Sequence, residues 1–177
     1  MIVRTESSVI SLKINSEKVA VNVAPRDTLL DVIRDSLGKT GAKKGCDEAV
    51  CGACSVLLNG KSICSCNILA MEAQGSEIVT IEGLGNLEAG SGKTYHDPLQ
   101  DAFVRFDAQQ CGFCTSGQII SARSFLNQLD KIEVVADETI SEALSGNICR
   151  CGCYNKIVDA VRYVIELEHK QKVGEKP

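Results

Sequence analysis

Eight of the ten cysteines in this chain of 177 residues fall into two separated groups of four. The first group has the spacing C-x4-C-x2-C and then, after eleven further residues, a fourth cysteine; its members are Cys46, Cys51, Cys54 and Cys66. Such spacing is typical of a loop whose thiolates hold a [2Fe–2S] cluster. The second group joins a C-x2-C pair to a distant C-x-C pair; its members are Cys111, Cys114, Cys149 and Cys151. Two sets of four thiolates predict two iron–sulfur clusters, and therefore a protein that transfers electrons.

Spacing alone leaves two questions open. Cys64 precedes Cys66 by two residues, and residues two apart in a strand share a face, so either could be the fourth ligand. Four thiolates could also bind a structural zinc ion. Zinc sites usually combine two C-x2-C pairs, so the first group favours iron–sulfur, whereas the second group by itself fits either metal. A cysteine that is not a ligand, as Cys153 would be, is interpreted as a small buried hydrophobic residue.

The composition favours a protein of the reducing cytoplasm. The N-terminus lacks a basic segment followed by an apolar run, so no secretory signal is expected. No stretch approaches the roughly 20 apolar residues of a membrane span. In a reducing compartment, cysteines at such spacings favour metal binding over disulfides. The net charge of −4 and the aromatic content of 4% argue against a nucleic-acid partner, which needs a basic face and stacking platforms.

The first half of the chain has the pattern of a compact α+β unit. Apolar and polar residues alternate over 10–14 and 19–23, which predicts a hairpin. A helix is expected next, capped by Asp27 or Thr28 and ended at Gly38. The Gly- and Cys-rich stretch that follows has no period and predicts a loop. A hairpin is expected over 55–63, with its turn at Asn59-Gly60. A short helix from residue 67 and a strand over 77–81 are expected to follow.

The second half of the chain has the pattern of an all-helical unit. Four glycines make residues 82–94 a probable linker. Helices are expected to begin near Asp97-Pro98, at Thr115 or Ser116, at Asp137 and at Asn155. A boundary here divides the chain into domains 1–84 and 85–177, with one cysteine group in each.

Four longer motifs occur in order along the chain: GCDEAVCGAC at 45–54, SC at 65–66, QCGFCTSG at 110–117 and GNICRC at 146–151. Together they resemble the iron–sulfur subunit of molybdenum hydroxylases, the family of xanthine dehydrogenase, aldehyde oxidoreductase and carbon monoxide dehydrogenase small subunits. The resemblance extends from about residue 8 to residue 164.

The resemblance implies a fold and a set of site residues. Domain 1–84 would be a β-grasp, plant-type ferredoxin-like domain, and domain 85–177 an all-α four-helix bundle, each with one [2Fe–2S] cluster. The family places its fourth ligand of the first cluster after a Ser at a helix start, which favours Cys66 over Cys64. Gln110 matches a position that contacts the pterin, and Cys151 would lie close to the same cofactor.

The resemblance also implies a function. The chain would be the electron-transfer subunit of a multisubunit molybdenum hydroxylase, with no catalytic residue of its own. Electrons would pass from the molybdopterin of a large subunit, through the two clusters, to FAD in a medium subunit. Ser116 and the sequence Gly152-Cys153-Tyr154 resemble the aldehyde-oxidising branch, so an aldehyde is the expected substrate. The alternatives are a purine or other N-heterocycle as substrate, or a free two-cluster ferredoxin.

Overall fold

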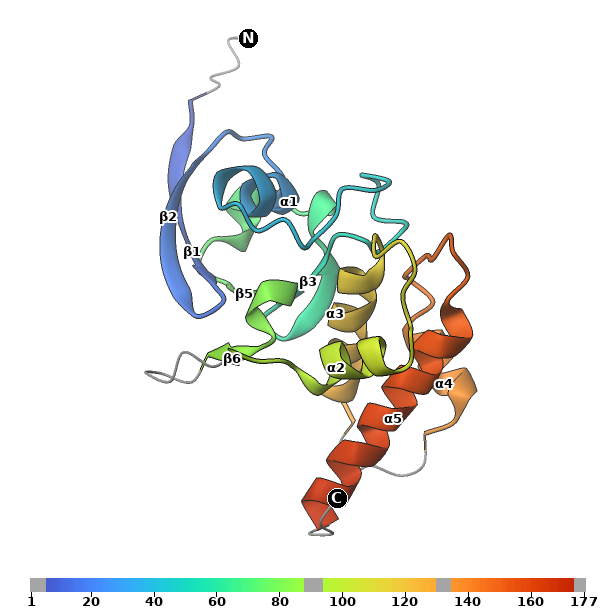
Figure 1. Ribbon diagram of the computed structural model, residues 1–177. Helices are drawn as coiled ribbons and strands as arrows, with labels where there is room; N and C mark the ends of the chain where they lie inside the picture. Colours follow the sequence, from blue (N-terminus) through green and yellow to red (C-terminus); the bar gives the residue numbers. More distant parts are fainter. Residues whose placement is uncertain (1–5, 88–93, 130–134, 174–177) are drawn as a thin grey trace.

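The structure is a computed structural model that describes residues 6–87, 94–129 and 135–173. Figure 1 shows a strand-rich part that carries the N-terminal half of the chain, beside a part made of helices that carries the C-terminal half. Each part has its own cluster of buried apolar side chains. The predicted order of a mixed α+β unit followed by helices is therefore confirmed.

The strand-rich part is built on a five-stranded sheet with the order β2-β1-β5-β3-β4. β1 pairs with β2, and β3 with β4, as antiparallel hairpins, and β5 joins the two hairpins by pairing parallel to β1 and antiparallel to β3. Both predicted hairpins are confirmed. Asn59 and Gly60 have φ of 50° and 82°, the left-handed values that a tight hairpin turn needs. The strands are β1 (Ser8–Ile14), β2 (Glu17–Val23), β3 (Ser55–Leu58), β4 (Lys61–Cys64) and β5 (Glu77–Val79).

One helical segment packs its apolar side chains into the core of this sheet. It begins as α1 (Leu29–Asp31) and continues as a π-helical turn over Val32–Ser36. Thr28 caps it, because its hydroxyl accepts a hydrogen bond from the Asp31 N–H at 3.1 Å. Gly38 follows with φ +66°, so the predicted cap and end are both confirmed.

Two expectations for the segment after β4 are wrong. In place of a helix from residue 67, two 3₁₀ turns occur, at Ser65–Asn67 and Ala70–Ala73. Backbone hydrogen bonds from Leu29 to Ile68 and from Ala70 to Asp27 tie this segment to the start of α1 and prevent a continuous helix. The next strand ends at Val79, two residues early, because Thr80 bonds to Asn15 and the backbone turns. The expected linker contains paired strands β6 (Asn86–Leu87) and β7 (Thr94–Tyr95), while 88–93 lie outside the described residues.

The second part contains α2 (Pro98–Arg105), α3 (Thr115–Leu126), α4 (Asp137–Ala143) and α5 (Tyr154–Val173). Asp97 caps α2 as predicted, accepting from the Leu99 N–H at 2.9 Å. Two other cap predictions are wrong. Cys114, not Thr115 or Ser116, is the residue before α3, and the Ser116 hydroxyl donates to the Gly41 carbonyl instead. Asp137 lies inside the first turn of α4, where it pairs with Arg162. Within the described ranges, no helix has the length and apolar character needed to cross a bilayer.

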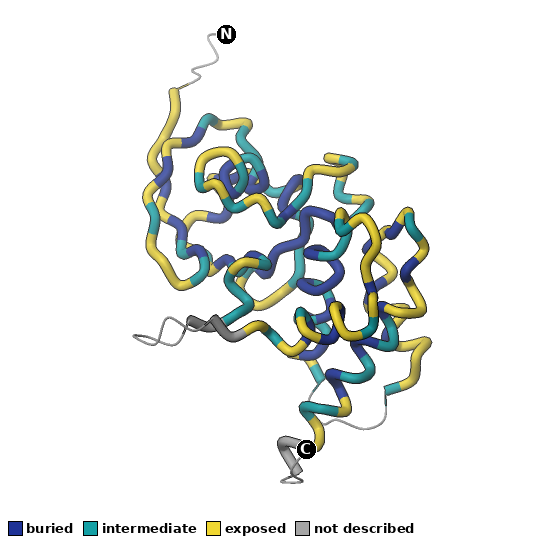
Figure 2. The backbone as a smooth tube through the Cα atoms, viewed as in Figure 1, coloured by how far each residue is buried: buried dark blue, intermediate teal, exposed yellow. Residues whose placement is uncertain are grey.

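The two parts meet where α3 lies against β3 and β4 (Figure 1). Figure 2 shows α3 as mostly buried, and eight of the eleven residues from Ser116 to Leu126 are buried. Hydroxyl groups cross the junction: the Ser62 N–H donates to Ser124 Oγ at 3.0 Å, and the Ser62 and Ser121 hydroxyls lie 3.1 Å apart. This packing holds the loops before α3 in a defined position relative to the sheet.

Candidate metal centres

The first cysteine group lies on a loop that curls around Cys46. Asp47, Ala49 and Gly52 have left-handed φ values of 61°, 56° and 68°, which bend the backbone tightly. As a result three N–H groups point to Cys46 Sγ, those of Glu48, Val50 and Cys51, at 3.4, 3.3 and 3.4 Å. A side chain at Gly45 would place its Cβ 3.0 Å from Cys51 Sγ, so glycine permits this close approach.

These contacts set the protonation behaviour of the sulfurs. The N–H groups of Glu48, then Val50 and Cys51, lower the pKa of Cys46 to about 7, because they stabilise the thiolate. Burial raises the pKa of Cys66 to about 11. A hydrogen bond with Cys64, followed by burial, raises the pKa of Cys54. Cys46 therefore presents the anionic form that metals bind, and a bound cation would favour the same form at the buried sulfurs.

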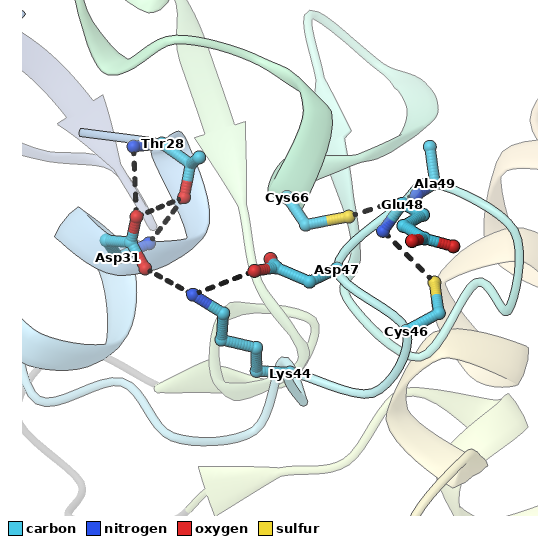
Figure 3. Close-up of polar contacts among 8 residues, drawn as sticks. All are labelled: Thr28, Asp31, Lys44, Cys46, Asp47, Glu48, Ala49 and Cys66. Atoms are coloured by element: carbon cyan, nitrogen blue, oxygen red, sulfur yellow. Dashed lines mark hydrogen bonds and ion pairs between the residues drawn. The ribbon is translucent and has the colours of Figure 1, made fainter. Parts of the chain in front are cut away.

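Cys64 and Cys66 lie close together but have different contacts. Cys66 sits in the 3₁₀ turn after β4, and its sulfur accepts the Ala49 N–H at 3.4 Å (Figure 3). Cys64 ends β4, and its thiol instead donates to the Ala49 carbonyl at 3.8 Å. N–H donors suit a thiolate ligand, whereas a carbonyl partner suits a protonated thiol. The N–H contact favours Cys66 as the ligand, whereas the hydrogen bond with Cys54 lowers the pKa of Cys64 and burial raises the pKa of Cys66, so the assignment stays a prediction.

A charged network holds the cysteine loop against α1 (Figure 3). Lys44, two residues before Cys46, bonds to Asp31 at 3.1 Å and to Asp47 at 3.2 Å. Asp31 also accepts from the Thr28 N–H and hydroxyl at 3.1 and 2.6 Å. Burial raises the pKa of Asp31, but the hydrogen bonds from Thr28 and Lys44 outweigh it, so this pKa lies below its ordinary value. The network links the start of the helix to the start of the loop.

Replacing Asp31 with asparagine is expected to lower the free energy of unfolding at neutral pH by about 1 kcal/mol or less, because the carboxylate is partly exposed and screened. Since its pKa is lower in the folded chain, its stabilisation is present above the ordinary value of 3.8 and is lost as the pH falls through the folded value. The variant and the parent should therefore converge in acid. Chemical denaturation at several pH values tests this, with the exposed Asp35→Asn on the same helical segment as control. A constant difference down to the lowest pH would contradict the explanation.

The second cysteine group lies on two loops that precede α3 and α5, as predicted. Cys111 and Cys114 come just before α3, and Cys149 and Cys151 just before α5. Cys151 lies close enough to Cys111 to help lower the pKa of Cys111, and Cys149 lies close enough to Cys114 to help raise the pKa of Cys114, so each loop pairs one cysteine with one of the other loop. The structure thus brings together four sulfurs that the sequence separates by about 40 residues.

Local contacts also shift the pKa values of Cys111, Cys114 and Cys149. The Phe113 N–H, and then the thiol of Cys151, lower the pKa of Cys111. Burial, and then the hydrogen bond with Cys149, raise the pKa of Cys114 to about 12. Burial also disfavours the thiolate of Cys149, but hydrogen bonds from the Cys153 N–H and from Cys114 outweigh it and lower this pKa. Each pair therefore contains one sulfur biased towards the anionic form.

The two predicted pterin-facing residues lie next to each other. Gln110 Nε2 donates to the Cys151 carbonyl at 3.5 Å, and the Gln110 side chain is exposed. Cys153, the extra cysteine, is buried and contacts Cys149. This arrangement leaves Gln110 on the surface beside the second cysteine group.

The donor set fits a two-iron cluster. Cys46 lies beside Cys51, and Cys54 lies beside both Cys64 and Cys66. A [2Fe–2S] cluster takes four thiolates on two irons, and N–H donors to sulfur stabilise its negative charge. Across the described parts of the chain, no group of three or more His, Cys, Asp or Glu side chains is placed to hold a metal ion, so the cysteines of each set are neighbours and do not yet form a closed ligand shell.

Two supporting contacts were not predicted from the sequence. The loop of the first cysteine group touches the loop before Cys149, through hydrogen bonds made by Asn147 and Ile148. Gly117 of α3 lies against Gly52 of the same loop. All the residues in these contacts fall inside the motifs around the cysteines, and this was the only signal for the contacts in the sequence.

Comparison with protein families identifies both halves. Residues 12–80 match the family described as "2Fe-2S iron-sulfur cluster binding domain", and residues 80–162 match "[2Fe-2S] binding domain". These matches confirm the two predicted [2Fe–2S] clusters, a ferredoxin-like first domain and a second domain that the structure shows to be helical.

Named relatives cover most of the chain. It is 46% identical to the aldehyde oxidoreductase iron-sulfur-binding subunit PaoA of Escherichia coli, covering 86% of this chain and 69% of the relative. It is 43% identical to the nicotinate dehydrogenase small FeS subunit of Eubacterium barkeri, covering 89% of this chain and 94% of the relative. Among solved structures, quinoline 2-oxidoreductase from Pseudomonas putida 86 has a chain of similar fold, with a TM-score of 0.83 and 38% identity over 97% of this chain and 99% of that one.

Proposed function

The chain belongs to the iron–sulfur subunits of molybdenum hydroxylases, and from this premise we propose that it relays electrons from molybdopterin in a large subunit to FAD in a medium subunit. When bound, each [2Fe–2S] cluster supplies a centre that accepts and releases single electrons. The chain's own residues hold the centres, shape their surroundings and keep them at a set separation. The observation that carries the proposal is that both cysteine groups, each in its own [2Fe–2S] domain, lie on loops that touch each other.

We assign the metal ligands as two sets. The ferredoxin-like domain would hold the first cluster with Cys46, Cys51, Cys54 and Cys66. The helical domain would hold the second cluster with Cys111, Cys114, Cys149 and Cys151. Support comes from the sulfur pairs and from the N–H groups that point at Cys46 and Cys66. These donors favour the more negative, reduced state of a bound cluster and so raise its potential.

The face around Gln110 is proposed to meet the molybdopterin of the large subunit. Its side chain is exposed next to Cys151, so a partner could reach both. The ferredoxin-like cluster would then lie towards FAD. In this assignment Gln110 and Cys151 contact or approach the pterin, and no residue of this chain acts on the substrate.

An aldehyde is the proposed substrate of the assembled enzyme. Support comes from the relative with 46% identity, which is named for aldehyde oxidoreductase. The alternative is an N-heterocycle, which is supported by the relatives named for nicotinate dehydrogenase and quinoline 2-oxidoreductase.

Three structural proposals accompany this function. We place the domain boundary near residue 84, in the segment where the change of core occurs: Ile78 is the last residue of the first core, and Ile81 and Leu84 already pack against the second. We interpret α2 to α5 as the four-helix bundle of the family, supported by their shared core. We also propose a cytoplasmic location, since the cysteines would bind metal best in a reducing compartment.

The test is anaerobic purification of the chain with the subunits that accompany it, followed by addition of an aldehyde or, in parallel, nicotinate. Reduction of two distinct cluster signals and of a flavin by one of these substrates is the expected result. A lone monomer with full electron-transfer activity would instead favour a free two-cluster ferredoxin. A colourless preparation that contains zinc and no acid-labile sulfide would reject both.

A further inference from the structure

The two cysteine loops are joined by the side chain of one residue. Asn147 Nδ2 donates to the carbonyl of Gly52 at 3.0 Å, across 95 positions of sequence. Gly52 lies between two proposed ligands of the first cluster, and Asn147 lies two residues before a proposed ligand of the second. We propose that Asn147 is a positioning residue that sets the separation and orientation of the two cluster sites, an inference that rests on the proposed electron relay.

Asn147 is held rigidly enough for this role. Only 5% of it is exposed, and its backbone N–H donates to the Leu144 carbonyl at 3.0 Å. Its own carbonyl accepts from Gln118 Nε2 at 3.1 Å, which ties it to α3. A buried residue whose backbone N–H and carbonyl are both bonded has little freedom to move, so the helical domain determines where the Asn147 side chain starts.

The loop of the first domain fits closely against this amide. Gly52 has φ +68°, and a Cβ there would lie 2.5 Å from both Asn147 Nδ2 and the Gly146 carbonyl. On its other side, a Cβ at Gly117 of α3 would overlap the Gly52 carbonyl oxygen. The Gly52 backbone is therefore enclosed between α3 and Asn147, and no larger residue could approach as closely.

A second contact runs beside the first. The Ile148 N–H donates to the Cys51 carbonyl at 2.9 Å, so two consecutive residues of one loop bond to two consecutive residues of the other. This backbone bond depends on the loops being correctly aligned, and the Asn147 amide supplies the alignment. Because electron transfer slows steeply with distance, a small loosening here would slow transfer between the sites.

The test uses the assembled complex carrying Asn147→Ala or Asn147→Asp. The aspartate keeps the shape of the side chain but cannot donate to the Gly52 carbonyl, so two acceptors would face each other. Ser145→Ala is the matched control, because Ser145 is exposed on the same loop. Two quantities are measured. The first is the magnetic spin–spin interaction of the two clusters when both are reduced. The second is the rate of electron transfer between the clusters after rapid reduction to the half-reduced state of the complex.

Both Asn147 variants are expected to weaken or alter the spin–spin interaction and to slow electron transfer between the clusters relative to the unmodified complex. Ser145→Ala should change neither quantity. If Asn147→Ala loses a cluster, the two quantities are compared in Asn147→Asp instead. If that variant also loses a cluster, Asn147→Ser is used, because its hydroxyl is too short to reach Gly52. Lower thermal stability with an unchanged interaction and rate would overturn the proposal. Absence of two clusters from the unmodified complex would reject the proposed function instead.

Discussion

Replacing Cys46 with serine is expected to remove the cluster of the ferredoxin-like domain and leave that of the helical domain in place. Three backbone N–H groups are directed at this one sulfur, and they lower its pKa to about 7, so it ionises more readily than an ordinary thiol. A serine hydroxyl is a harder and far less acidic ligand than a thiol, so it would bind iron–sulfur clusters poorly. Iron and acid-labile sulfide should fall to about half, and one of two reduced-cluster spin signals should disappear.

Cys64→Ser is the matched control for this prediction. It changes another sulfur of the same domain, which contacts Cys54 and the Ala49 carbonyl. If Cys66 is the fourth ligand, the Cys64 variant should keep both signals and the full iron content. Loss of a cluster from the Cys64 variant, combined with a harmless Cys66→Ser, would show that the fourth ligand is Cys64.

Replacing Arg123 with leucine is expected to lower the unfolding temperature by roughly 6–12 °C, equivalent to about 3 kcal/mol. Arg123 bonds to Asp97 at 2.6 Å and to Glu168 at 2.9 Å, and thereby joins α3 to the start of α2 and to α5. The side chains of Arg123 and Asp97 are only 13% and 10% exposed. Burial lowers the pKa of Arg123, but the bonds and charges of Asp97 and Glu168 raise it overall. Removing the guanidinium leaves a nearly buried carboxylate without its counter-charge.

Arg162→Leu provides the comparison for Arg123, because Arg162 also bonds to two carboxylates. Its contacts with Asp137 and Asp159 are as short, at 2.6 and 2.9 Å, but these groups are 35% to 51% exposed. Solvent screens such pairs, so the loss should be at most about 1 kcal/mol. Thermal unfolding of the two variants, followed by circular dichroism, separates the cases. Equal losses would show that burial does not determine the strength of these pairs.

Local signals allowed much of the fold to be predicted. The Asn59-Gly60 turn, the Thr28 cap and the Asp97-Pro98 helix start all depend on backbone preferences of a few neighbouring residues. Predictions failed where a distant partner competed for a local group. Ser116 could have capped α3, but its hydroxyl bonds to Gly41, 75 residues earlier. The segment after Cys66 could have continued as a helix, but bonds to the start of α1 divide it into short turns.

The cysteine spacing and the surrounding motifs indicated by themselves the [2Fe–2S] chemistry and the family, because a loop that encloses a cluster must place its ligands at short and definite intervals, and the two ligand sets stay a prediction from the same pattern. Only the tertiary structure decided which sulfurs form pairs, how Cys64 and Cys66 differ, and how the two loops meet at Gly52 and Asn147. The physical reason is that these features consist of hydrogen bonds and close contacts between residues far apart in the chain. Such contacts exist only once α3 has packed against the sheet.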